Sequence, residues 1–310
     1  MPHSKVHQAA QEGNLIQLKQ LIESDSRLAN APRKLLNGRD VYPLEEALCN
    51  RHYDCAILLL EYGANPSIQY SYCNDKLTPL HIVAEKHILP KVLLLLYFGA
   101  NTTCKDTVGI TPLGKLGLLP PQHGYKITPE AFKKYIEDFN QLRTLENQYT
   151  DAAKNNKQEE QKNLAIEIGN IFMRMGNEVI RFPQTEEYYL AIAQFFYKKA
   201  IPYYSLVADF YYKHLNEKQF DKNKYLEVGT LLADLHHRIH DFDMRDHYDK
   251  QLLAVDTNYQ RSNDDMEWRE KTTIKKLPSS HSTPFWLKPI ELLHKLTNGE
   301  TYKNWLRLHP

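Results

Sequence analysis

The stretch Thr78–Asn101, TPLHIVAEKHILPKVLLLLYFGAN, contains the local signals that decide the fold. Thr78 is suited to cap a helix, and Pro79 suits the first helical position, where a missing N–H costs nothing. Spacings of three and four residues place three apolar side chains on one face of this short helix, namely Leu80, Val83 and Ala84. An aliphatic helix is predicted over 91–99, and Gly99 predicts its left-handed end. The stretch therefore predicts a pair of short helices.

Parts of this stretch recur along the chain. The motif TPL at 78–80 has a counterpart, YPL, at 42–44, and GAN at 99–101 has one at 63–65, so both landmarks shift by 36 residues. TPL occurs once more at 111–113, and a fainter copy, VHQAAQEGN, lies near the start of the chain. Self-similarity at such a period is typical of repeat proteins, in which each unit stacks on its neighbours.

These motifs resemble the ankyrin repeat, in which TPLHxAA opens an inner helix and a GA(D/N) ending follows an outer helix. The resemblance covers residues 1–125, about three and a half units, and the last unit breaks at GLLPPQHGY. It implies that His81 forms hydrogen bonds that brace neighbouring loops, and Glu45 replaces that histidine in the second unit.

The resemblance also implies that loop tips and inner-helix positions contact a protein partner, because stacking leaves them free to vary. Leu77 and Ile110 are the expected apolar anchors of this surface. The inner-helix positions include Gln11, Glu12 and Cys49. The predicted partner-binding residues are Gly38, Arg39, Val41, Asn50, Asn74, Asp75, Leu77, Glu85, Lys86, Thr107, Val108 and Ile110.

Residues 126–257 predict a second, helical domain, so the fold class is all-α. TPEAFKKYIEDFNQLRTLENQY begins with a Thr128 cap and carries an apolar face. Three further segments resemble halves of tetratricopeptide repeats: IGNIFMRMGN at 168–177, AQFFYKKA at 193–200 and HDFDMRDHYDKQLLAVD at 240–256. The resemblance implies helical hairpins that approach closely at small residues, among them Gly169, Gly176 and Gly229. Residues 258–310 predict a helical extension or cap, with short helices around 286–296 and 300–308.

Composition excludes several classes of protein. Lys plus Arg (39) nearly balances Asp plus Glu (38), which argues against a general binder of nucleic acid or anionic membrane. The longest apolar run, 92–98, is far shorter than the ~20 residues that span a bilayer, and the first residues do not resemble a signal peptide. The four cysteines lack the spacing of a disulfide framework, which predicts a reducing, cytoplasmic location: Cys49, Cys55, Cys73 and Cys104.

Two groups of residues suggest chemistry or a binding groove. His236 and His240, one helical turn apart, with Asp243 or His247, are a candidate metal site and echo some metal-dependent phosphohydrolases. Against it, His240 lies where the repeat family places a turn, and further ligands are not apparent. The aromatic residues between 188 and 212 exceed what one buried face needs, so they predict mostly core, or in part a groove for a peptide. No cofactor motif is present.

The leading hypothesis is a non-enzymatic adaptor that joins protein partners through two repeat surfaces. Divergent ankyrin units joined to an unusual helical half also resemble effectors that intracellular bacteria secrete into the host cytosol without a classical signal peptide. The competing hypothesis is an enzyme, with a metal-dependent hydrolytic site in the helical half and substrate recruited by the ankyrin half. A self-assembling scaffold is a third alternative.

Overall fold

A computed structural model describes residues 2–36, 38–69, 76–118, 126–182, 187–214 and 221–256. Residues 1–259 form one compact unit, and residues 260–310 form a second, which lies outside the described residues. The two helices predicted in the last fifty residues therefore also lie outside them.

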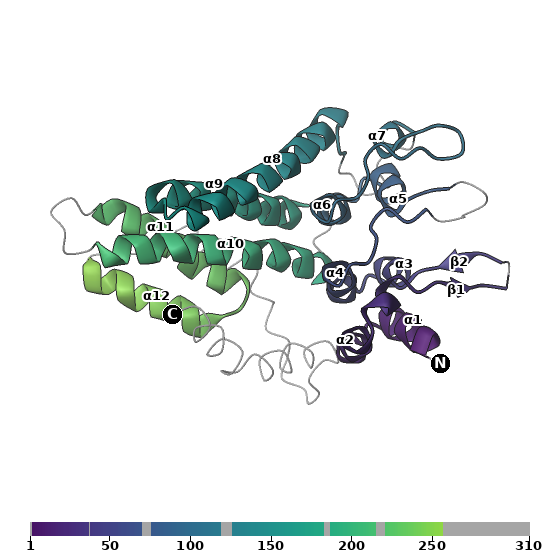
Figure 1. Ribbon diagram of the computed structural model, residues 1–310, viewed down its shortest axis with the longest axis horizontal. Helices are drawn as coiled ribbons and strands as arrows, with labels where there is room; N and C mark the ends of the chain where they lie inside the picture. The colour runs from purple at the N-terminus through teal and green to yellow at the C-terminus, as the bar shows by residue number, and fades with distance from the viewer. Residues whose placement is uncertain are drawn as a thin grey trace, which may run out of the picture. The chain divides into compact units, whose positions relative to one another are not determined.

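The N-terminal part is a series of helix pairs that stack one on the next (Figure 1). The pairs are α1 (Pro2–Glu12) with α2 (Leu15–Ser24), α3 (Pro43–Cys49) with α4 (Tyr53–Glu61), and α5 (Pro79–Glu85) with α6 (Leu89–Tyr97). A short 3₁₀ helix, η1 (Ser26–Asn30), follows the first pair. A single turn, α7 (Pro112–Lys115), opens a fourth unit and packs on α5. The stacked pairs agree with the repeat inferred from the sequence.

Helix ends follow the local signals. The Thr78 hydroxyl caps α5 by accepting from the His81 N–H, with Pro79 in the first turn. Gly99, the second residue after α6, has a φ angle of 80°, so its predicted left-handed end is confirmed, and Gly63 has a φ angle of 85° at the same place after α4. The outer helix of the third unit begins at Leu89, two residues earlier than predicted, because Pro90 is tolerated in its first turn.

The all-α prediction needs one correction. A hairpin of two short antiparallel strands, β1 (Arg33–Lys34) and β2 (Asp40–Val41), projects between the first two helix pairs (Figure 1). Gly38, at a φ of 79°, donates its N–H to the Leu35 carbonyl and closes the turn. An Asn-Gly sequence favours such a turn between strands, so the signal was already present at 37–38.

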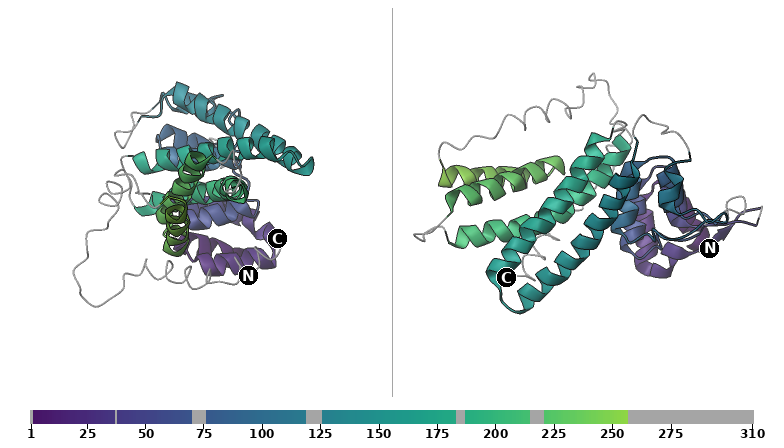
Figure 2. Two further views of the ribbon diagram at one scale, coloured as in Figure 1. Left: turned by 90° about the vertical axis from the view of Figure 1, so that its left-hand side faces the viewer. Right: turned by 90° about the horizontal axis from the view of Figure 1, so that it is seen from above.

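The C-terminal part is a helical bundle (Figure 2). It contains α8 (Pro129–Lys154), α9 (Gln158–Arg181), α10 (Glu187–Lys213), α11 (Lys222–Arg238) and α12 (Phe242–Val255). Thr128 caps α8 as predicted, by accepting the N–H of Ala131. In sequence order, each helix packs on the one before it.

Glycines allow α9 and α10 to approach closely. A Cβ at Gly169 would lie 2.9 Å from the ring of Tyr204, and a Cβ at Gly176 would lie closer still to Tyr197. The predicted close pairing at small residues is confirmed. The motif segments 168–177 and 193–200, however, lie inside helices of 24 and 27 residues rather than in short hairpins. The tetratricopeptide likeness therefore stays a prediction.

The outer helices of the stack pack against the bundle through aromatic side chains. The Tyr97 ring of α6 lies edge-on to Phe139 of α8, with centroids 6.2 Å apart, and to Phe195 and Phe196 of α10 at 5.3 and 6.0 Å. Tyr53 of α4 stacks on Tyr189 at 5.3 Å. One hydrophobic core thus runs through both parts. The predicted division after residue 125 separates two segments that share this core.

This packing also shows the role of several aromatic residues between 188 and 212, which were predicted to form mostly core or in part a groove. One face of α10 meets α9 through Tyr197 and Tyr204, and another meets the outer helices through Phe195 and Phe196. All four are at most 6% exposed, so they belong to the core rather than to a groove. Tyr212, at 52%, is exposed.

Candidate partner-binding surface

The loop before α7 is held rigid by a single carboxylate. Asp106 accepts the N–H groups of Val108 and Ile110 at 3.0 and 2.8 Å, and it pairs with the Lys115 ammonium at 2.9 Å. Burial alone would raise the pKa of Asp106, but the lysine and the backbone donors hold it below its usual value. These bonds fix the tip 107–109 with its side chains turned outward.

His81 connects this loop to the unit before it. Its Nδ1 accepts the Thr78 N–H at 3.1 Å, and its Nε2 lies 3.1 Å from the Ile110 carbonyl. Because a carbonyl only accepts, Nε2 carries the proton and donates. His81 is fully buried, and burial lowers its pKa, against the opposing effect of the Ile110 carbonyl. The predicted bracing role is confirmed.

The first unit achieves the same bracing with a histidine as well, and the second unit achieves it with an ion pair. His7 places Nε2 at 2.9 Å from the Ala31 carbonyl. In the second unit Glu45 stands in the position of that histidine and forms an ion pair with Arg39 of the hairpin. The neighbouring Glu46 binds Arg33 at 2.5 Å. Every complete helix pair therefore ties the loop beside it through one buried polar residue of its inner helix.

Comparison with known families agrees with this geometry. Residues 6–106 match the family model of ankyrin repeats, in three copies. No curated protein matches the chain significantly. Ankyrin repeats are generally protein–protein interaction modules, so a protein partner is expected for this part of the chain. The match ends before α8, and it therefore carries no information about the helical bundle.

The predicted partner-binding residues differ in their exposure to solvent. Five are exposed: Gly38, Asn50, Lys86, Thr107 and Val108. Four are half-buried: Arg39, Leu77, Glu85 and Ile110. Asn74 and Asp75 lie outside the described residues. The inner-helix positions Gln11, Glu12 and Cys49 are exposed.

Three of these residues make contacts that support the fold. Val41 is only 5% exposed, since strand alternation turns it inward. The Arg39 side chain is 14% exposed and belongs to the ion pair with Glu45. Ile110 bonds through its backbone to both His81 and Asp106, so it anchors its loop. These positions are poor sites for mutations that aim to test binding alone.

Sequence reasoning missed one apolar residue of this surface. Leu36 lies at the tip of the β1–β2 hairpin and is fully exposed, while Val108, on the loop before α7, is 73% exposed. The adjacent Asn-Gly sequence at 37–38 favours a turn between strands, and this signal would have placed Leu36 next to the tip. The expected apolar anchors, Leu77 and Ile110, are less accessible than these two residues.

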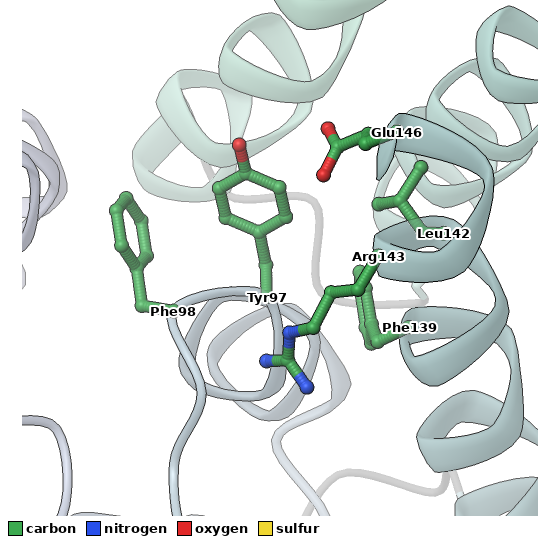
Figure 3. Close-up of a pocket in the computed structure, with 6 residues that line it drawn as sticks. All are labelled: Tyr97, Phe98, Phe139, Leu142, Arg143 and Glu146. Atoms are coloured by element: carbon green, nitrogen blue, oxygen red, sulfur yellow. The ribbon is translucent and has the colours of Figure 1, made fainter. Parts of the chain in front are cut away.

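A pocket of about 330 Å³ lies where the end of α6 meets α8 (Figure 3). Its lining residues are Tyr97, Phe98, Phe139, Leu142, Arg143 and Glu146. Arg143 reaches the Leu96 carbonyl at 3.4 Å, at the end of α6. Burial raises the pKa of Glu146, which accepts a 3.4 Å hydrogen bond from the Tyr203 hydroxyl. The pocket is part of the junction between ankyrin stack and bundle, and Arg143 joins the two.

The candidate metal residues do not come together in the structure. Helix α11 ends at Arg238 and His240 has a φ of 63°, so His236 and His240 are not on successive turns of one helix. His236 instead places Nδ1 at 3.1 Å from the Asp241 carboxylate, which caps α12. Within the described ranges, no cluster of three or more His, Cys, Asp or Glu side chains is arranged to hold a metal ion.

The cysteines differ sharply in accessibility. Cys49 is exposed and Cys55 is buried in α4, where burial raises the pKa of its thiol to about 12. Alkylation at pH 8 should therefore modify Cys49 in the folded protein and leave Cys55 intact, because Cys55 is buried and its raised pKa leaves almost no reactive thiolate at that pH. Peptide mass spectrometry before and after denaturation measures this. Equal labelling of both cysteines in the folded state would contradict the burial of α4 against the bundle.

None of the helices in the described part of the chain combines the length and the apolar character needed to cross a membrane.

Proposed function

We propose that this chain is a non-enzymatic adaptor whose ankyrin repeats bind a protein partner through their loop-tip side. The observation that carries the proposal is the position of the bundle. The outer helices α4 and α6 are occupied by contacts with α8, α9 and α10. The loop tips, including Thr107 and Val108, are exposed, and so are the inner-helix ends at Asn50 and Lys86. A partner that binds the repeats therefore contacts these exposed positions.

The bundle gives the adaptor a rigid base and a second surface. Its attachment to the stack is reinforced by an ion pair between Lys199 of α10 and Glu61 of α4, at 3.3 Å. The α11–α12 hairpin exposes two large apolar side chains, Phe242 at 44% and Leu253 at 45%. The tetratricopeptide-like pattern of this hairpin supports a role in binding a further protein. In this proposal the two surfaces hold two partners at a fixed separation.

A finer form of the proposal concerns where the protein acts. Divergent ankyrin units next to an unusual helical half resemble the architecture of effectors that work inside a eukaryotic host cell. We infer from this resemblance that the partner of the loop tips is a eukaryotic cytosolic protein. Cytosol from eukaryotic cells should then yield a partner, and a bacterial lysate should not.

Site-specific photo-crosslinking tests the loop-tip surface. With benzoylphenylalanine in place of Val108, irradiation in eukaryotic cytosol should give a discrete adduct heavier than the 36.3 kDa chain. The same group in place of Asn147, an exposed residue of α8, is the matched control and should give at least about tenfold less adduct. The adduct is identified by mass spectrometry and its binding is repeated with purified components. Absence of an adduct with the same group in place of Val108 and, in a second variant, in place of Leu36 would remove the loop tips from the proposal.

A further inference from the structure

We propose that the loop tips bind an acidic segment that carries large apolar side chains. The inference rests on the proposed function and specifies the chemistry of the partner. The residues that carry it are three lysines and two apolar residues, which we call the tip row: Lys34, Leu36, Lys76, Lys105 and Val108. They belong to three successive loops that project from the same side of the stack (Figure 1).

The apolar members are held outward by hydrogen bonds of the backbone. Next to Leu36, the Leu35 N–H donates to the Arg39 carbonyl at 2.8 Å, and the Gly38 N–H donates to the Leu35 carbonyl at 2.9 Å. Val108 is fixed through its own N–H to Asp106. Neither side chain can turn into the core without breaking these bonds. Two preorganised apolar side chains, on the first and third of these loops, are what a partner's apolar residues would cover, at little cost in ordering.

The charges of these loops are divided unequally between interior and surface. Three carboxylates next to the loops are neutralised internally, Asp106 by Lys115, Glu45 by Arg39 and Glu46 by Arg33. The lysines of the tip row are exposed, and in the described part of the chain they take part in no ion pair. The surface therefore offers cations beside apolar groups, while these three neighbouring carboxylates are already paired. Charge complementarity then favours a partner segment rich in Asp and Glu.

A polyanion without apolar groups fits this surface less well. The chain has a formal net charge of only +1, and the three lysines are interrupted by Leu36 and Val108. Nucleic-acid binding draws on a continuous basic surface that follows the phosphates. The apolar side chains among these lysines favour a peptide whose carboxylates alternate with large apolar residues.

Peptide selection tests the chemistry directly. The full-length chain is used to select from a phage-displayed library of random peptides of about twelve residues. Sequences enriched in Asp or Glu together with Leu, Ile, Phe or Trp are expected. A synthetic peptide of the selected consensus should bind in fluorescence anisotropy, and its affinity should fall by at least about tenfold when salt is raised to about 0.5 M.

Matched variants locate the binding on the tip row. Lys34→Glu with Lys105→Glu should weaken the consensus peptide by at least about tenfold, and so should Leu36→Ser with Val108→Ser. Lys133→Glu with Lys134→Glu, which changes the same number of charges on exposed residues of α8, should have no effect. Unchanged thermal unfolding of each variant shows that the fold is retained.

Several outcomes overturn the inference. Selection of neutral or basic peptides, or equal weakening by the α8 control, would contradict it. Tighter, tip-row-dependent binding of a single-stranded DNA of about 20 nucleotides would show a polyanion site instead. If the crosslink at Val108 captures a partner while the selected peptides are not acidic, only the inference fails. If neither experiment finds binding at the tips, the proposed function fails with it.

Discussion

Replacing Phe196 with alanine is expected to lower the free energy of unfolding by about 3–5 kcal/mol, the range for a truncated buried aromatic residue. Phe196 is fully buried in α10. Its ring centroid lies 6.0 Å from that of Tyr97 in the ankyrin stack, 6.4 Å from that of Phe139 in α8 and 5.4 Å from that of Phe195. The cavity would open where stack and bundle meet. Urea unfolding followed by circular dichroism measures the loss.

Tyr212→Ala is the matched control for this prediction. Tyr212 lies on the same helix but is 52% exposed, so its truncation should cost less than about 1 kcal/mol. Because the core is continuous, limited proteolysis of the Phe196 variant should increase cleavage in the ankyrin stack and in the bundle at the same denaturant concentration. Loosening of the bundle alone, with an unchanged stack, would show that the two parts unfold independently.

Replacing His81 with alanine should lower the free energy of unfolding by about 2–4 kcal/mol, because it leaves the buried Thr78 N–H without its acceptor and removes the donor that links α5 to the Ile110 carbonyl. The loop 106–110 should become more accessible at the same time, which amide hydrogen exchange detects. Lys86→Ala, at the exposed end of the same helix, should change stability by less than about 0.5 kcal/mol.

The same substitution should change how stability depends on pH. Burial lowers the pKa of His81 in the folded protein, so the unfolded chain takes up its proton first, near pH 6.5. The contribution of His81 is therefore complete above about pH 6.5 and is lost as the pH falls through the lowered value. The stability difference between wild type and His81→Ala should shrink between pH 7.5 and 5. A constant difference over this range would show that His81 keeps its ordinary pKa.

Local features of the fold were predictable from sequence because they depend on neighbouring residues. Thr78 with Pro79 predicted the start of α5, and Gly99 predicted the end of α6. The recurrence of both landmarks after 36 residues predicted the stack, since similar helix pairs bury their faces against each other. The capped start of α8 at Thr128 was predicted in the same way. All of the capping signals act within a few residues of the chain.

The candidate surface was predicted only in part. Sequence position placed Thr107 and Val108 on an exposed tip, and the structure agrees. It also placed Val41 there, although Val41 is buried, and it omitted Leu36, which is fully exposed. The difference comes from the hairpin: pairing of Arg33 with Val41 fixes which side chains face inward, and a shift of one residue would reverse them.

By itself, the sequence determined the repeated helix pairs and their caps, since each depends on local chemistry repeated at a fixed spacing, while the bracing role of His81 came from the resemblance to ankyrin repeats. Only the tertiary structure decided that Tyr97 meets Phe195, a residue 98 positions later, and that the outer helices are covered by the bundle. Such contacts depend on how distant helices pack in three dimensions, which no local pattern encodes. That packing leaves the loop tips as the exposed edge of the ankyrin repeats.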